Sequence, residues 1–279
     1  MKSLWSYRPD CEIENVSFDE DYLVFSSGSS LYCLDADARK IIWKKRMTTT
    51  FYRDPFSDVS ITALDAKGPM IAAGTNFMDG KIYLFTKTGK LLWEHQFATI
   101  ASLGWRPEDV TAVGIGDNFV AVGTEFIGEH IYVYTFKRER MFHKRVNGTV
   151  RAIAANRCLA VGTDEKLYVF EPDGRERFSI TAQVTDVKIT ETGILTSSGN
   201  RVYMFSSNGK ELWHKSFDCE IKQLYCNGRI YAIAGKRVVV MSESGDILKD
   251  VELEGSPVGI GGSGILTLDG NTLKMYPLP

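Results

Sequence analysis

An apolar residue followed by tryptophan recurs along the chain at nearly regular intervals. The doublet occurs as Leu4-Trp5, Ile42-Trp43, Leu92-Trp93 and Leu212-Trp213, with weaker versions at Met141-Phe142, Arg177-Phe178 and Ile247-Leu248. Successive second residues lie 38, 50, 49, 36, 35 and 35 positions apart, and passing from Leu248 through the C-terminus to Trp5 takes another 36. A repeat that continues across the two ends of the chain predicts seven units, with the N-terminus supplying the last strand.

Each unit has the pattern of four short strands, which we label A to D. In residues 109–145, Asp109-Val-Thr-Ala-Val-Gly and His130-Ile-Tyr-Val-Tyr-Thr alternate apolar and polar residues, and the intervening segment is rich in β-branched residues. Such strands, bounded by turn residues, predict an antiparallel meander. No segment maintains a 3.6-residue period, so we expect almost no helix.

A single sheet of this kind leaves its two faces exposed, whereas stacking such sheets around an axis buries them. We therefore predict one all-β domain over residues 1–279. Its fold is a seven-bladed β-propeller of four-stranded antiparallel blades, closed by pairing of the N-terminal strand in Met1–Arg8 onto the last blade, beside Leu273–Tyr276. The tryptophan of each strand D is then expected to pack against the next blade.

The segments from strand C to strand D resemble those of a known repeat. Ile82-Tyr-Leu-Phe-Thr-Lys-Thr-Gly-Lys-Leu-Leu-Trp and Val202-Tyr-Met-Phe-Ser-Ser-Asn-Gly-Lys-Glu-Leu-Trp are similar to the pyrroloquinoline-quinone-type propeller repeat, in which an alternating strand, a Gly-Lys turn and a tryptophan follow one another. WD-repeat propellers have a similar architecture, but their Trp-Asp doublet ends the third strand. The resemblance covers the whole chain, and it is weakest in the sixth unit.

The resemblance implies a fold family and a binding platform more than an activity, since one fold hosts many functions. Quinone-dependent dehydrogenases of this family have eight blades, a much longer chain, a calcium site and a secretion signal. The family's outer-membrane assembly lipoproteins need a signal and a lipidated cysteine. The sequence has seven units and neither signal, so we expect no cofactor.

Composition and charge narrow the class of protein further. The net charge of −2 provides no general attraction to nucleic acid or to an anionic membrane. The first eight residues lack the apolar core of a secretion signal, and no apolar run approaches the roughly 18 residues that span a bilayer. The five cysteines show no CxxC spacing, as expected for free thiols. We expect a cytoplasmic protein that does not contact membranes.

Two units are longer than the others, by roughly a dozen residues each. In both units the extra residues precede strand A and lie between strands B and C, and in a meander these connections emerge at the same end. They contain aromatic, methionine and arginine residues of the types enriched in interface hot spots. The predicted partner-binding residues are Phe51, Tyr52, Arg53, Phe56, Phe77, Met78, Trp105, Arg106, Phe126 and His130. The alternative is that these connections pack on themselves or plug the channel.

The mouth of the central channel is the second candidate site. Strand A is expected to be innermost, and aligning its copies brings charged residues to the entrance. The candidates for binding a small ligand are Glu12, Glu14, Asp109, Arg151 and Lys222. Propeller channels are commonly lined by polar residues, so the same pattern also fits a solvated channel.

Other chemistry has little support in the sequence. His95, His143 and His214 fall on the outer strands of three different blades, which argues against a shared metal site. Gly261-Gly262-Ser263-Gly264-Ile265 lacks the last glycine of a nucleophile elbow. Basic stretches at 39–46 and 137–145 lie on outer strands, where charge discourages aggregation, and a nucleic-acid groove is not expected.

The sequence thus favours a non-catalytic protein-interaction scaffold, a subunit or assembly factor of a cytoplasmic complex, that binds a protein through the enlarged connections of blades 2 and 3. The alternative is a small-molecule-binding, hydrolytic or lyase-type propeller that uses the polar mouth of the channel. The question of enzymatic activity stays open, because propeller enzymes assemble their sites from residues on several blades.

Overall fold

The structure is a computed structural model that describes residues 2–8, 12–19, 21–35, 40–48, 59–76, 79–101, 104–125, 128–261, 264–270 and 272–279. For residues 99–101, 104 and 105 it describes the backbone only. Strands and turns account for the regular structure of these ranges, which contain no helix, as predicted. No helix long and apolar enough to cross a membrane is therefore present among them.

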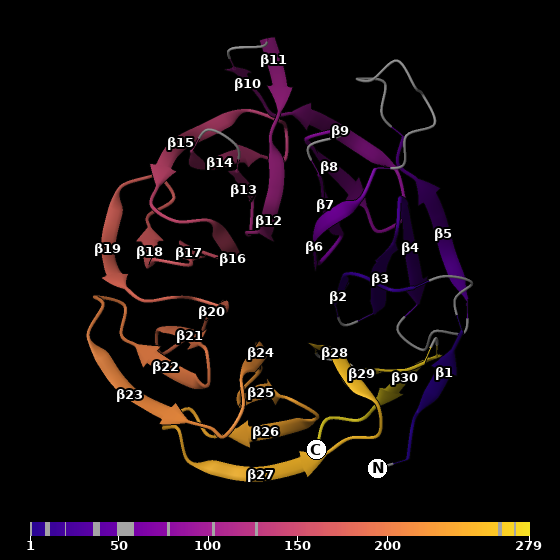
Figure 1. The fold of residues 1–279 in the computed structure, drawn as a ribbon, viewed down its shortest axis with the longest axis vertical. Coiled ribbons are helices and arrows are strands. Elements are labelled where there is room, and N and C mark those ends of the chain that lie inside the picture. The colour runs from indigo at the N-terminus through magenta and orange to yellow at the C-terminus, as the bar shows by residue number, and fades with distance from the viewer. Residues whose placement is uncertain are drawn as a thin grey trace. The chain divides into compact units, whose positions relative to one another are not determined.

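The strands form seven four-stranded antiparallel sheets and one two-stranded ribbon (Figure 1). This confirms the predicted fold class, a seven-bladed β-propeller. The chain divides into two compact units, one of residues 10–150 and one of residues 1–9 with 151–279. Blades 1 to 3 belong to the first unit and blades 4 to 7 to the second.

The first unit holds three blades and the ribbon. Blade 1 consists of β2 (Val16–Phe18), β3 (Tyr22–Ser27), β4 (Ser30–Asp35) and β5 (Ile41–Arg46). Blade 2 consists of β6 (Ile61–Lys67), β7 (Met70–Thr75), β8 (Lys81–Thr86) and β9 (Leu91–Gln96). The ribbon of β10 (Ala98–Ala101) and β11 (Gly104–Pro107) follows, and blade 3 consists of β12 (Asp109–Ile115), β13 (Phe119–Glu125), β14 (Glu129–Thr135) and β15 (Arg140–Val146).

The second unit holds four blades. Blade 4 consists of β16 (Val150–Ala155), β17 (Leu159–Thr163), β18 (Lys166–Phe170) and β19 (Glu176–Thr181). Blade 5 consists of β20 (Asp186–Ile189), β21 (Ile194–Ser198), β22 (Arg201–Phe205) and β23 (Glu211–Ser216), and blade 6 of β24 (Ile221–Cys226), β25 (Ile230–Ala234), β26 (Arg237–Met241) and β27 (Ile247–Glu252). Blade 7 consists of β28 (Ser256–Gly261), β29 (Gly264–Asp269), β30 (Thr272–Tyr276) and the N-terminal β1 (Trp5–Tyr7).

Strand β1 completes blade 7, as the repeat spacing predicts. It pairs antiparallel with β30, placing Trp5 opposite Met275 and Tyr7 opposite Leu273. The Leu4 amide extends the ladder by donating to the Met275 carbonyl at 2.7 Å. The sheet order is β1-β30-β29-β28, so residues near the N-terminus occupy the strand D position of the last blade.

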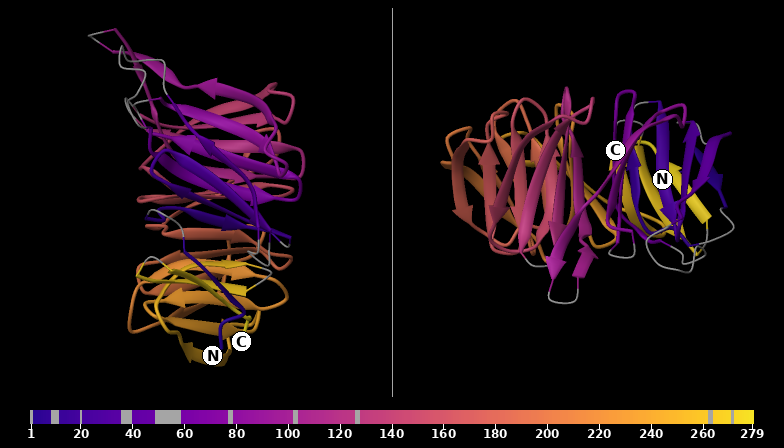
Figure 2. Two further views of the ribbon diagram at one scale, coloured as in Figure 1. Left: turned by 90° about the vertical axis from the view of Figure 1, so that its right-hand side faces the viewer. Right: turned by 90° about the horizontal axis from the view of Figure 1, so that it is seen from above.

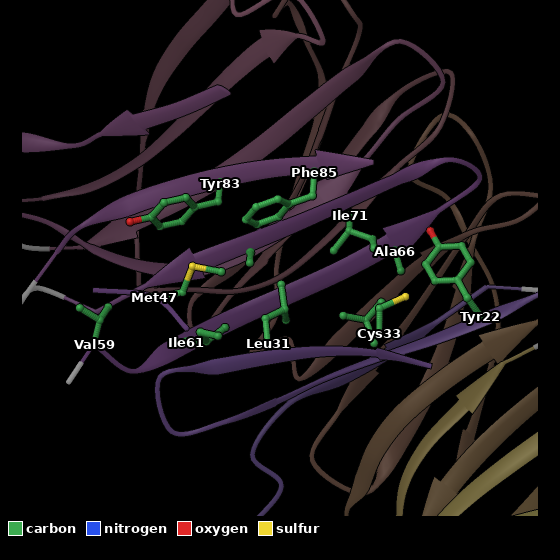
Figure 3. Packing of buried hydrophobic residues seen from close by; sticks show 12 residues of the cluster. Tyr22, Leu31, Cys33, Met47, Val59, Ile61, Ala66, Ile71, Tyr83 and Phe85 are labelled. Carbon is green, nitrogen blue, oxygen red and sulfur yellow. The ribbon is translucent and has the colours of Figure 1, made fainter. Parts of the chain in front are cut away.

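Alternation along each strand places apolar side chains against both neighbouring blades. In β7, Ile71 and Ala73 contribute to the core between blades 1 and 2, whereas Ala72 contributes to the core between blades 2 and 3. Figure 3 shows the first of these cores, with Tyr83 and Phe85 of β8 above side chains of blade 1. The same arrangement recurs between blades 4 and 5, 5 and 6, and 6 and 7. The period-two pattern of the sequence therefore supplies two buried faces per blade.

Glycine near the end of strand B allows the next blade to approach closely. A Cβ at Gly74 would lie 2.2 Å from Val110 Cγ1, and one at Gly162 would lie 2.2 Å from Val184 Cγ1. Each glycine precedes a fully buried threonine, Thr75 or Thr163, whose hydroxyl bonds the backbone at the start of strand C. A larger residue at either glycine would force the blades apart.

Three of the strand D tryptophans, Trp43, Trp93 and Trp213, join adjacent blades, as the sequence predicts. The indole Nε1–H of Trp43 donates to the Lys87 carbonyl at 2.9 Å, and that of Trp93 donates to the Phe136 carbonyl at 2.9 Å. In the second unit Trp213 donates to the Glu243 carbonyl at 2.8 Å. Each acceptor lies in the C–D turn of the following blade, so the tryptophan contributes a hydrogen bond as well as apolar contact.

A second link between blades uses aspartate on strand A. Asp65 Oδ2 accepts the Ile115 amide of blade 3 at 2.7 Å, and Asp186 Oδ2 accepts the Leu224 amide of blade 6 at 2.8 Å. These amides lie on the innermost strands, where no sheet partner from their own blade reaches them on that side. Each carboxylate thus satisfies a buried donor that would be costly to leave unpaired.

The cysteines that the structure describes, Cys33, Cys158, Cys219 and Cys226, are free thiols. Cys226 ends β24, whereas Cys219 precedes its start, so the strand separates the two thiols of blade 6. Burial raises the pKa of Cys33 to about 12 and that of Cys226 to about 11. Both groups are therefore protonated and weakly reactive at neutral pH.

Candidate functional site

Most of the predicted partner-binding residues lie outside the described residues. These are Phe51, Tyr52, Arg53, Phe56, Phe77, Met78 and Phe126. Trp105 lies in β11, where only the backbone is described. Arg106 and His130 are described, and both are half-buried.

The insertion before blade 3 forms a two-stranded antiparallel ribbon, which the sequence did not predict. Its register places Thr99 opposite Arg106 and Ile100 opposite Trp105. Figure 2 shows β10 and β11 extending past the strands of the neighbouring blades of their unit. Because an isolated two-stranded hairpin is marginal in water, the ribbon depends on the way its base is held.

The base of the ribbon is fastened to the B–C connection of blade 2. The Phe97 amide donates to the Gly80 carbonyl at 2.7 Å, and the Glu108 amide donates to the Phe97 carbonyl at 3.0 Å. Gly80 has a φ of +60°, and a Cβ there would lie 2.6 Å from Pro107 Cβ. Phe97 is itself buried and packs on Tyr132 with ring centroids 4.8 Å apart. Two of the enlarged connections are therefore one joined structure.

A buried carboxylate organises this B–C connection. Asp79 is fully buried, its Oδ2 accepts the Tyr83 hydroxyl at 2.5 Å, and its Oδ1 lies 3.4 Å from Lys81 Nζ. Lys81 also pairs with Glu94 at 3.0 Å, and the Asp79 carbonyl accepts from Gln96 Nε2 at 2.9 Å. The network ties residues 79–81 to strands C and D of their own blade.

The protonation states in this network follow from burial and charge. Burial, reinforced by the hydrogen bond to Asp79, raises the pKa of the Tyr83 hydroxyl well above its usual range. Burial opposes the charge on Lys81, but its contacts with Glu94 and Asp79 together raise the pKa of that ammonium group. At neutral pH the tyrosine is a neutral donor and the lysine a cation, which suits the carboxylate between them.

An aromatic and histidine cluster lies next to the ribbon base, on the outer half of blade 3. The His143 ring stacks on Tyr132 with centroids 4.4 Å apart, and it meets His130 at 4.9 Å. His95 of blade 2 contacts Phe97 at 5.0 Å and Tyr134 at 5.1 Å. The buried Glu108 accepts the Thr124 hydroxyl at 2.6 Å. His130 thus packs against other rings of this cluster while it stays half-buried, and its role in partner binding stays a prediction.

Sequence reasoning missed Asp79, Glu108 and the pairing of His130 with His143. Asp79 and Glu108 each lie at the end of an enlarged connection. An acidic residue in a segment that is otherwise apolar or contains glycine is the sequence feature that could have indicated a buried carboxylate. The histidine pair depends on register, because β14 and β15 align Tyr132 with His143 and His130 with Arg145. The separation of His95, His143 and His214 onto three blades is confirmed.

The histidines of this cluster predict a pH-dependent stability. Burial, then Arg138 and Arg140, lowers the pKa of His95, while burial, then His130 and Arg140, lowers that of His143. Protons therefore bind the unfolded chain more tightly than the folded one. Stability is greatest above the unfolded pKa of about 6.5 and falls as the pH drops through that value toward the lower folded pKa.

We expect a lower Tm at pH 5.5 than at pH 7.5, measured by calorimetry. Replacing both histidines by glutamine should make the dependence of Tm on pH shallower over this interval. An unchanged dependence in the double variant would show that other groups are responsible.

The predicted channel-mouth residues are divided between the two units. Glu12 and Glu14 precede β2 and Asp109 opens β12 in the first unit, whereas Arg151 in β16 and Lys222 in β24 belong to the second. Glu12, Glu14, Arg151 and Lys222 are exposed, and Arg151 pairs with Asp164 at 3.5 Å. Among the described residues, no group of three or more His, Cys, Asp or Glu side chains is placed to hold a metal ion.

Comparison with known proteins relates this architecture to two kinds of propeller. BamB from Moraxella catarrhalis superposes with a TM-score of 0.62 at 15% identity, over 98% of this chain and 88% of that one. BBS1N, solved in complex with ARL6DN, superposes with a TM-score of 0.69 at 15% identity, over 92% of this chain and 87% of that one. At such low identity both likenesses concern the fold alone.

Sequence comparison gives a more specific result. No curated protein matches the chain at a significant level. The model of the PQQ-type repeat family described as outer membrane protein assembly factor BamB matches residues 3–130 and 78–258. These matches span most of the chain and confirm the resemblance read from the C-to-D segments. The chain belongs to this PQQ-repeat family, the one described as outer membrane protein assembly factor BamB.

Proposed function

We propose that the protein is a non-catalytic interaction scaffold, a subunit or assembly factor of a cytoplasmic complex, that binds a protein partner through the enlarged connections of blades 2 and 3. The observation that carries this proposal is the β10–β11 ribbon, which extends past its neighbouring blades (Figure 2) and is fastened at its base. A projecting hairpin has little use for the stability of the blades themselves.

The anchoring supports recognition with a low entropic cost. Gly80, Phe97 and Glu108 fix both ends of the ribbon by backbone hydrogen bonds, and Asp79 fixes the adjacent connection. A partner that docks here meets segments whose bases are already ordered, so less conformational freedom is lost on binding. Trp105 and Arg106 of β11 are residue types that dominate interface energies.

The relatives support the same class of function. The family is described as an assembly factor, and the fold relative BBS1N was solved in complex with another protein. Both descriptions concern those proteins, and they make a protein partner the favoured expectation for this chain.

The test compares capture of a partner by the intact protein and by a variant with Trp105→Ala and Phe77→Ala. We expect an affinity-tagged wild type to recover one protein in stoichiometric amount from the cells that produce it. The variant should recover at least about tenfold less, because hot-spot truncations commonly cost 2 kcal/mol or more. If the two side chains contact the partner rather than the blades, the Tm of the variant should stay within about 2 °C of wild type.

The control is Leu212→Ala together with Leu248→Ala, which removes two exposed apolar side chains from blades 5 and 6. This control should retain the partner. Equal recovery by both variants would refute the proposed surface. A large fall in the Tm of the Trp105 and Phe77 variant would instead support connections that pack on themselves.

A further inference from the structure

The outer strand of blade 3 and the turn before it present an unusual concentration of positive charge. Lys137, Arg138, Arg140, Lys144 and Arg145 are all exposed, and Glu139 is the one acid between positions 137 and 145. Five cations and one acid make a local charge of +4 in a chain whose net charge is −2. We call residues 137–145 the basic edge.

Most of the basic edge is electrostatically unsatisfied. Some exposed cations elsewhere pair with acids, as in Lys87 with Asp21 at 2.7 Å and Arg177 with Glu171 at 2.8 Å. Across the described ranges, no ion pair involves the edge residues Lys137, Arg138, Arg140, Lys144 and Arg145. Arg138 has a contact with a neutral partner instead, His95 Nδ1 at 3.4 Å.

The repeat provides an internal comparison for this charge. Charged residues on a strand edge discourage aggregation, but strand D of blades 4, 5 and 6 achieves this without an excess of positive charge. In β19 and β23 one cation accompanies one acid, and β27 carries one lysine with two acids. Protection of the edge therefore does not account for the charge on blade 3.

Blade 1 has a comparable basic run, but its lysines have another role. Lys44 lies over the Tyr32 ring at 4.7 Å, and Lys45 lies over the Phe85 ring at 5.6 Å. Phe85 belongs to the core between blades 1 and 2, and Tyr32 stacks on Phe25 of its own blade. No such ring contact is present for the lysines of the basic edge within the described residues. Their charges are available to a partner.

The effect of this charge is visible in neighbouring groups. Arg138 and Arg140 contribute, after burial, to the lowered pKa of His95, and Arg140 contributes to that of His143. An anion bound to Arg138 and Arg140 would offset their positive charge and raise the pKa of both histidines. In the folded protein, the arginines of the basic edge are therefore close enough to these histidines to act on them electrostatically.

The geometry of β15 fits an extended peptide. It is the last strand in the order β12-β13-β14-β15, so the backbone groups on its outer side have no partner within the sheet. An extended segment can add to such an edge through main-chain hydrogen bonds while its side chains meet those of the strand. A groove for single-stranded nucleic acid would offer stacking platforms, whereas Tyr132 and His143 stack on each other.

We propose that the basic edge binds an acidic, extended segment of a partner protein by strand addition to β15. This surface adjoins the enlarged B–C connection of blade 3, because a Cβ at Gly128 would lie 3.2 Å from Arg145 Nε, and the experiment below tests it separately from the proposed function. The positive charges would select an acidic partner and speed its association with the protein. The backbone hydrogen bonds to β15 would fix the register of the added strand.

The test uses a fluorescein-labelled ten-residue peptide that alternates glutamate and threonine, with binding measured by anisotropy at 50 and 200 mM salt. We expect binding to wild type that weakens with salt. The variant Arg140→Glu, Lys144→Glu and Arg145→Glu should raise the Kd by about tenfold or more, equivalent to 1.4 kcal/mol. Lys144→Glu alone should raise it by a smaller factor and provides a second measurement should the triple variant fold poorly.

The matched control changes the net charge equally on other blades, through Lys210→Glu, Arg229→Glu and Lys249→Glu, three exposed cations. It should keep the Kd within about twofold of wild type, because these cations belong to blades 5 and 6 and would act on the peptide only through the net charge, which salt screens. Equal loss in both triple variants would reduce the effect to net charge and overturn the proposal.

Two further probes define the partner class. A peptide of the same sequence with alternate backbone amides methylated should lose binding, and retained binding would overturn strand addition. A labelled twenty-nucleotide oligothymidine should bind more weakly than the peptide. Tighter binding of the oligonucleotide, lost in the Arg140, Lys144 and Arg145 variant, would assign the basic edge to nucleic acid instead.

Discussion

Replacing Trp213 by alanine is expected to lower the free energy of unfolding by about 3 kcal/mol, the low end of the range for replacing a core aromatic by alanine, because Trp213 is half-buried. The indole joins blades 5 and 6 through its bond to the Glu243 carbonyl at 2.8 Å. Its ring also lies against Gly245, where an added Cβ would come within 2.9 Å of it. Alanine would leave a gap at this contact and an unpaired carbonyl.

The adjacent Leu212 provides the matched control. It is 50% exposed and belongs to the same apolar doublet, so Leu212→Ala should change stability by no more than about 0.5 kcal/mol. Urea unfolding followed by circular dichroism and by tryptophan fluorescence measures both variants. Similar losses for the two residues would mean that the doublet acts through general hydrophobicity and that the indole does not join the blades.

Replacing Asp79 by alanine is the second change for which we expect a large effect, a loss of about 3 kcal/mol. Removing one member of a buried ionic and hydrogen-bonded group leaves its partners desolvated and unpaired. Tyr83 would lose its acceptor at 2.5 Å, whereas Lys81 would keep Glu94 at 3.0 Å. The remaining pair is the reason for expecting a cost at the lower end of the range.

A double-mutant cycle with Tyr83→Phe identifies the source of this loss. If the Tyr83 hydroxyl depends on Asp79, the double variant should be more stable than the sum of the two single losses implies, by about 1 kcal/mol. Guanidinium unfolding at pH 7 measures all four proteins. Additive losses would show that Asp79 acts without Tyr83, through Lys81 or the backbone of the B–C connection.

The periodic features of the chain were predictable, because they follow from local patterns repeated seven times. The alternation in β7, the Gly-Lys turns and the spacing of the tryptophans each report a backbone conformation that neighbouring residues decide. Trp5 completes the count from the opposite end, and its pairing with Met275 confirms the inference. Errors in a single unit are outweighed by the other six.

The candidate site was less predictable, because it lies where the repeat is interrupted. The sequence of Ala98–Pro107, with its glycine and proline, is typical of a loop. The ribbon that it forms depends on hydrogen bonds of Gly80 and Phe97, which belong to another blade. Asp65 and Asp186 look like ordinary polar positions of an inner strand. Their bonds to amides 50 and 38 residues away require the neighbouring blade to be in place.

The sequence alone determined the number of blades, the order of strands and the use of the N-terminal strand to complete the last sheet, because these follow from periodicity and from spacing between the repeats. Only the tertiary structure decided which charged groups are paired and which are free. Lys45 and Lys144 are equivalent cations in the sequence, yet one lies over a phenylalanine ring and the other is exposed on an edge strand. Electrostatic satisfaction depends on neighbours in space, and the chain brings those neighbours together only when the blades stack.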